Sequence, residues 1–150
     1  MAAARKLPYR ELDRFQFSKE WGIAKRADLK AFHAGLVAEP AWVIDGIGVW
    51  GTIRDRLAAA DLIVHIDPPV WLNFLWAAKR GDGSAERGDG VTLPALETIY
   101  PFIWEYHRQI RPRLLRALDA LEGGKAIETL RDPEALDAFA AREARGAITV

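Results

Sequence analysis

Three aspartates follow short apolar runs, at points where a buried strand would end. Asp13, Asp45 and Asp67 each occupy such a position. Carboxylates at the ends of parallel strands would meet at one edge of a sheet, which is where open α/β sheets bind ligands. There they could hold a metal ion or accept hydrogen bonds from a polar ligand. The alternative is that each aspartate is only a turn or cap residue.

Alternating strand-like and helix-like segments would position these carboxylates. Strands are expected over residues 7–17, 41–44, 61–67 and 125–130. Helices are expected over residues 26–38, 52–60, 70–80, 93–121 and 132–145, with Thr52 as an N-cap and with Pro101 and Pro112 as breaks or fresh starts. This alternation predicts an α/β fold with a parallel sheet covered on both faces.

Composition limits the classes of protein to which the chain can belong. Its 150 residues suffice for one domain over 1–150, and 50% of them are hydrophobic. The 21 basic and 21 acidic residues balance, so overall charge indicates neither a nucleic-acid nor a membrane partner. No cysteine is present, which excludes disulfides and thiolate metal sites. We expect a cytoplasmic protein.

Three motifs, taken in order, resemble signatures of adenylate-kinase-like P-loop NTPases, the group often labelled topology modulation proteins. They are Leu12-Asp13-Arg14-Phe15-Gln16-Phe17 followed by Trp21, Trp42-Val43-Ile44-Asp45-Gly46, and Ile66-Asp67-Pro68-Pro69 followed by Trp71. Arg80, and later Arg108, Arg111 and Arg113, resemble arginines that flank a lid. The resemblance implies a three-layer, nucleoside-monophosphate-kinase-like parallel sheet, with residues 81–92 as a short lid-like loop.

The resemblance also implies an activity, the transfer of phosphate from ATP, with Mg²⁺, to a nucleotide or other small acceptor. Arg80, Arg108 and Arg111 would be the catalytic arginines. The residues that would bind the acceptor are Asp13, Phe15, Trp21, Asp45, Gly46 and Arg54. Asp45 would hold Mg²⁺ through water, and Asp67 has a weaker claim to the metal. The alternatives are strand-end turns for the aspartates and solvated surface charges for the arginines.

One element of that family does not occur in the sequence. The string Gly-x-x-x-x-Gly-Lys-Ser/Thr, whose backbone amides cradle phosphates, is absent, and the family's first, central strand precedes it. Either the start is assigned too far downstream or the chain is a remnant. As given, we expect it to be inactive, and exposed strand edges would favour a homodimer. The alternative function is a non-catalytic binding module that uses its acceptor pocket or an open sheet edge.

Tryptophan and histidine patterns lead to two further expectations. Trp71, Trp76 and Trp104 fall within helical apolar patterns and are expected to pack in the core. His65 alternates with apolar residues inside a strand and is expected to be a structural, hydrogen-bonded histidine. The three histidines show no metal-ligand spacing with one another.

Overall fold

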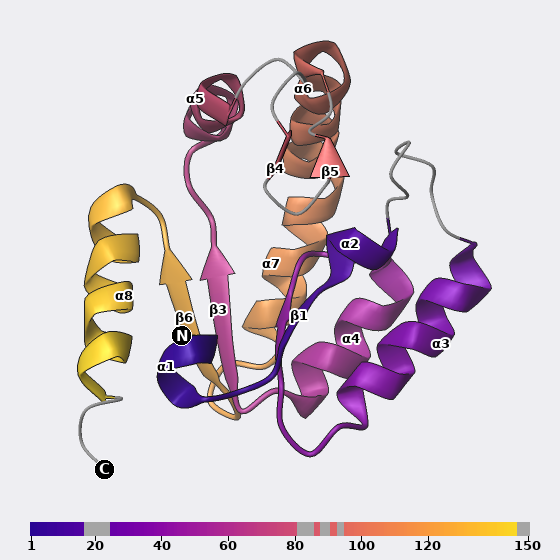
Figure 1. Ribbon diagram of the computed structural model, residues 1–150, viewed down its shortest axis with the longest axis vertical. Helices are drawn as coiled ribbons and strands as arrows, with labels where there is room; N and C mark the ends of the chain where they lie inside the picture. The colour runs from indigo at the N-terminus through magenta and orange to yellow at the C-terminus, as the bar shows by residue number, and fades with distance from the viewer. Residues whose placement is uncertain (17–24, 81–85, 88–90, 93–94, 147–150) are drawn as a thin grey trace. The chain divides into compact units, whose positions relative to one another are not determined.

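A computed structural model describes residues 1–16, 25–80, 86–87, 91–92 and 95–146 of the chain. The chain divides into two compact units, which are described separately below. Unit 1 comprises Met1–Ala60 and Pro133–Val150, and unit 2 comprises Asp61–Asp132. Figure 1 shows the helices and strands with their labels.

Unit 1 combines a pair of parallel strands with helices. Its elements are α1 (Ala2–Arg5), β1 (Tyr9–Glu11), α2 (Leu12–Gln16), α3 (Arg26–Val37), β2 (Val43–Asp45), α4 (Trp50–Ala59) and α8 (Pro133–Gly146). Strands β1 and β2 are parallel, with Glu11 opposite Asp45 at their ends. Helices α3 and α4 pack together through apolar residues at helical spacing, Leu29 and Leu36 on α3 and Ile53 and Leu57 on α4.

A paired charge fastens α1 to α8 inside unit 1. The Arg5 guanidinium donates two hydrogen bonds to the Glu143 carboxylate, at 2.6 and 2.8 Å. The Glu143 side chain is only 6% exposed, whereas the Arg5 side chain is 49% exposed. A buried carboxylate needs such a partner, because desolvation disfavours an unpaired charge. The hydrogen bonds from Arg5 accordingly hold the pKa of Glu143 below its ordinary value.

Unit 2 contains a second pair of parallel strands. Its elements are β3 (Leu62–Ile66), α5 (Val70–Arg80), β4 (Glu86–Arg87), β5 (Val91–Thr92), α6 (Leu96–Glu105), the π-helix η1 (Tyr106–Ile110), α7 (Arg111–Asp119) and β6 (Ala126–Leu130). Strands β3 and β6 run parallel and side by side (Figure 1), with Ile63 opposite Ile127. The two-residue strands β4 and β5 pair antiparallel. The unit therefore joins one short parallel sheet to a long, interrupted helical segment.

The predicted α/β class is confirmed at the level of mixed α and β structure with parallel strand pairs. The expected helix at 26–38 and the expected strands at 61–67 and 125–130 correspond to α3, β3 and β6. Among the described residues, each parallel sheet has two strands, β1 with β2 and β3 with β6. A two-stranded parallel sheet is small, since sheets usually have about four to six strands.

Two expectations near the first strand pair are wrong. Residues 7–17 are not one extended segment, because β1 ends at Glu11 and the helix α2 follows directly. The helical spacing of Leu12 and Phe15 buries Leu12 and brings the Phe15 ring onto Phe32, with centroids 3.9 Å apart. Thr52 is not an N-cap, because α4 already begins at Trp50 and the Thr52 hydroxyl donates to the Val49 carbonyl.

The two prolines of the long helical segment have different outcomes: the expected break at Pro101 is wrong, and the expected fresh start at Pro112 is confirmed. Pro101 does not break the helix, because it lies inside α6. Its missing N–H would have bonded Glu97, and both residues are exposed, so water can bond that carbonyl instead. The irregularity falls at the π-helix η1, and Pro112 sits in the first turn of α7, where proline is tolerated.

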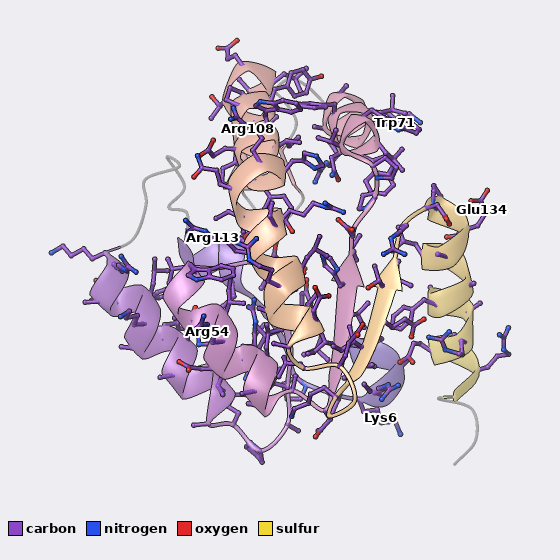
Figure 2. All side chains as sticks on the ribbon, turned by 180° about the vertical axis from the view of Figure 1, so that it is seen from behind. Lys6, Arg54, Trp71, Arg108, Arg113 and Glu134 are labelled. Carbon is purple, nitrogen blue, oxygen red and sulfur yellow. The ribbon has the colours of Figure 1, made fainter. Side chains whose placement is uncertain are left out.

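The predicted core position of two tryptophans is wrong. Trp71 is 62% exposed and Trp104 is 49% exposed, whereas Trp76 is half-buried. Figure 2 shows Trp71 on the side of α5 that points away from α6. Helix α5 instead packs on α6 through Phe74, whose ring meets Tyr100 edge-on at 5.2 Å. The apolar stripe of α5 is therefore wider than the face that α6 covers.

Candidate functional site

The carboxylate of Asp45 is held in place at the end of β2 in unit 1. Its Oδ2 atom accepts a hydrogen bond from the Tyr9 hydroxyl of β1, at 2.7 Å. Its Oδ1 atom accepts a hydrogen bond from the backbone N–H of Gly46, at 2.8 Å. Asp45 is nevertheless exposed, so the carboxylate is oriented but can still be reached by a ligand.

The Asp13 carboxylate lies against the same turn. Gly46 has a φ of +101°, a conformation that side chains rarely adopt. A Cβ atom at Gly46 would lie 3.1 Å from Asp13 Oδ1 and 3.2 Å from Leu12 Cβ. The glycine therefore allows the start of α2 to approach the Asp45–Gly46 turn closely. The structure brings together three predicted acceptor-binding residues, Asp13, Asp45 and Gly46.

Arg56 supports the turn from the buried side. Its Nη2 donates to the Ile47 carbonyl at 3.2 Å, and its Nη1 is buried with no hydrogen-bond partner among the described residues. Burial lowers the pKa of Arg56, and the charge of Asp45 opposes that shift. Sequence reasoning selected Arg54 for the acceptor, but Arg54 lies on the exposed face of α4 (Figure 2).

A helical pattern could have identified Arg56 in the sequence. It lies three residues after Ile53 and one before Leu57, so it belongs to the stripe of α4 that packs in unit 1. Facing it from α3 is His33, which is 3% exposed and whose Nε2 has no partner among the described residues. Burial, reinforced by the charge of Arg56, lowers the pKa of His33.

Basic side chains from α3 flank the first turn of α4. A Cβ atom at Gly51 would lie 3.6 Å from Lys30 Cε and 3.7 Å from Arg26 Nη2. Helix α4 has no side-chain cap, and the amides of a first turn together with nearby cations attract anions. We call the start of α2, the Asp45–Gly46 turn and the first turn of α4 the rim of the site. The rim has a carboxylate side, at Asp13 and Asp45, and a cationic side, at Arg26 and Lys30.

The two predicted aromatic contacts have different outcomes. Phe15 is 38% exposed and stacks on Phe32, so part of its ring still faces solvent beside Asp13. Trp21 lies outside the described residues, as does most of the predicted lid-like loop at 81–92.

In unit 2, two of the predicted residues are bound to each other. Arg111 donates from Nε to Asp67 Oδ1 at 2.6 Å and from Nη2 to Asp67 Oδ2 at 2.8 Å. Burial opposes ionisation of Asp67, but the hydrogen bonds and charge of Arg111 outweigh it, so the pKa of Asp67 is lowered. Because both carboxylate oxygens are engaged by Arg111, we assign no metal to Asp67.

The other predicted catalytic arginines do not join that pair. Arg80 ends α5, is exposed, and donates from Nε to the Trp76 carbonyl at 3.4 Å. Arg108 is exposed on η1. Arg111, the first residue of α7, is therefore the one predicted catalytic arginine that bonds Asp67 among the described residues.

His65 is buried, as expected for a structural histidine, but its predicted hydrogen bonds are missing. The residue is 6% exposed, and neither ring nitrogen has a partner among the described residues. Burial lowers its pKa, the charge of Asp67 opposes the shift, and those of Arg111 and Arg131 reinforce it.

The described residues offer few carboxylates to a metal ion. No cluster of three or more His, Asp or Glu side chains suited to a metal ion is present in the described residues. Asp13 and Asp45 would supply two carboxylates, which fits Mg²⁺ because that ion keeps several of its own waters. None of the described helices combines the length and apolar character needed to cross a bilayer.

Comparisons with protein-family models, with curated proteins and with solved structures found no match for this chain. The site is therefore interpreted from its own geometry.

Proposed function

We propose that this chain is the acceptor-binding part of an ATP-dependent, adenylate-kinase-like phosphotransferase. The observation that carries the proposal is the close approach of Asp13, at the start of α2, to the Asp45–Gly46 turn that follows β2. Phosphoryl transfer depends on positioning and charge neutralisation more than on covalent chemistry by the protein. A pair of oriented carboxylates suits that task, since it can hold hydrated Mg²⁺ or the hydroxyl groups of an acceptor.

The cationic side of the same rim supports a phosphorylated acceptor. Arg26, Lys30 and the uncapped first turn of α4 lie together near Gly51. An acceptor with both hydroxyl groups and a phosphate, such as a nucleoside monophosphate, would match both sides of the rim. In this proposal the two small parallel sheets belong to a three-layer P-loop fold whose central strand and phosphate loop are not among these 150 residues.

Binding of nucleoside monophosphates tests the acceptor site directly. With ¹⁵N-labelled chain and Mg²⁺, we expect adenosine monophosphate or a related nucleotide to shift the backbone amide signals of Gly46, Gly48 and Gly51. Asp45→Asn keeps a similar shape but loses the charge, and should weaken binding about tenfold, equivalent to about 1.4 kcal/mol. Asp119→Asn, an exposed aspartate of unit 2, should leave binding unchanged. Equal affinity for wild type and Asp45→Asn would contradict the proposal.

Catalysis requires a test of its own. Genomic sequence that encodes, in frame before Met1, a strand followed by Gly-x-x-x-x-Gly-Lys-Ser/Thr would support the kinase, and the extended protein should then consume ATP in the presence of the acceptor. These 150 residues alone should not bind Mg-ATP tightly, because they lack the loop that cradles a triphosphate. Tight binding of Mg-ATP by them would refute that part of the proposal.

A second candidate is a non-catalytic module that assembles through a sheet edge. The observation in its favour is that, within the described residues, each parallel sheet has only two strands, so each strand has backbone groups on one edge without a ladder partner. Light scattering on the purified chain tests this idea. A dimer that an Ile63→Pro substitution in β3 disperses would favour the module, whereas a monomer at all concentrations would exclude edge pairing between copies.

A further inference from the structure

His65 sits in unit 2 as a buried polar side chain that the proposed function does not use. It lies on β3 with Thr129 of β6 opposite, and the residue is 6% exposed. Both ring nitrogens are buried without a hydrogen-bond partner among the described residues. A neutral imidazole in that position leaves one donor and one acceptor unsatisfied, and a protonated one would leave two donors.

The charges around His65 determine what a proton there would do. Asp67 follows two residues later, just after β3 ends, and it is the one negative charge acting on His65 among the described residues. Arg111 from α7 and Arg131 after β6 act on it as positive charges. Tyr106 of η1 is half-buried. Burial and the charge of Asp67 raise its pKa, and the charge of Arg111 opposes that shift. A proton on His65 therefore has a single carboxylate available to it.

That carboxylate is already taken by Arg111. Both oxygens of Asp67 accept hydrogen bonds from the guanidinium, and the Asp67 side chain is 3% exposed. Arg111 is the first residue of α7 and directly follows the π-helix η1. The pair thus ties the end of β3 to the junction of η1 and α7. A single π-turn inside an α-helical segment is rare and frequently marks a functional site.

We propose that the Asp67–Arg111 pair is a proton-sensitive latch controlled by His65. When His65 takes up a proton, the imidazolium needs an acceptor and competes with Arg111 for Asp67. The bond between Asp67 and Arg111 then weakens, and the junction of η1 and α7 opens locally while the β3–β6 pair stays formed. This conformational switch lies outside the carboxylate site of unit 1, and its test does not depend on the proposed phosphotransferase function.

Amide hydrogen exchange of the whole chain measures the opening. Protection factors, corrected for the intrinsic exchange rate at each pH, are compared at about pH 7.5 and about pH 5.5. If His65 regains its ordinary pKa of 6.5 in the open state, protection over residues 106–114 should fall by up to about tenfold. Protection in β6 should fall much less. No fall over 106–114, or an equal fall in β6, would overturn the proposal.

Histidine variants assign the effect to one residue. His65→Gln should abolish the pH-dependent fall in protection, whereas His33→Gln and His107→Gln should retain it. His107 is the stringent control, because it lies on η1 itself and stacks on Trp104. A response that survives His65→Gln, or disappears in His107→Gln, would overturn the proposal. If His65→Gln fails to fold, the pH titration of the wild-type His65 imidazole by NMR takes its place. Titration of His65 at or above its ordinary pKa of 6.5 would overturn the latch.

Discussion

Breaking the Asp67–Arg111 pair should cost more when the arginine is removed than when the aspartate is. The Asp67 side chain is 3% exposed and the Arg111 side chain is 31% exposed. Arg111→Met keeps much of the apolar stem but leaves the Asp67 carboxylate without its partner in the interior of unit 2. Asp67→Asn leaves a guanidinium that can turn toward water. The two substitutions remove the same pair but leave different residues unsatisfied.

The size of the difference follows from these exposures. Loss of one member of a buried pair costs about 3–5 kcal/mol. Protonation of Asp67 limits that cost, because neutralising a carboxyl with an ordinary pKa of 3.8 at about pH 7 takes about 4.4 kcal/mol. We therefore expect Arg111→Met to lower the free energy of unfolding by about 3–4 kcal/mol at that pH. Asp67→Asn should lower it by about 1–2 kcal/mol.

The dependence on pH separates this explanation from simple loss of packing. In the wild type the pKa of Asp67 is lowered, so the stability contributed by the ion pair is present above the ordinary pKa of 3.8 and is lost as the pH falls through the lower folded value. In Arg111→Met the Asp67 carboxyl has no cationic partner, so it takes up a proton more readily than in the wild type as the pH falls. The destabilisation should therefore shrink by up to about 1.4 kcal/mol per pH unit between about pH 7 and pH 5.

Urea unfolding of the three proteins across this pH range is the assay. Arg108→Met, an exposed arginine on the neighbouring π-helix, is the matched control and should change stability by less than about 0.5 kcal/mol. Equal costs for Arg111→Met and Asp67→Asn, with no pH dependence of the difference, would refute the reasoning. In that case the carboxylate would not depend on the arginine for its burial.

Three further predictions concern unit 1. Gly46→Ala should destabilise the fold by about 1–3 kcal/mol in thermal unfolding, because φ is +101° and a Cβ would press on Asp13; Gly35→Ala, with open space in α3, should not destabilise it. Glu143→Gln should lower stability by about 1 kcal/mol, since its arginine partner is half-exposed, and the difference should vanish in acid as the wild-type carboxylate is protonated. His33 has a lowered pKa, so the stability of wild type should fall as the pH drops below 6.5, and His33→Gln should reduce that fall.

Local pattern was enough to predict most of the regular elements. Apolar periodicity indicated α3, and a compact apolar run indicated β3, because burial on one face or both imposes a repeat that is legible in a single chain. The same reasoning pointed to Asp13 and Asp45 as strand-end carboxylates. That prediction is confirmed for Asp45, the last residue of β2, and is wrong for Asp13, which lies in the helix α2 that follows β1.

Tertiary structure alone decided which polar side chains meet. The spacing between Asp67 and Arg111, or between Tyr9 and Asp45, carries no local period. The first hydrogen bond depends on how α7 meets the end of β3 in unit 2, and the second on how β1 pairs with β2 in unit 1. The exposure of Trp71 likewise depends on the width of the face that α6 covers. Sequence determines the propensity of each segment and the chemistry it carries, whereas partners distant in the chain are chosen by packing, which no local pattern encodes.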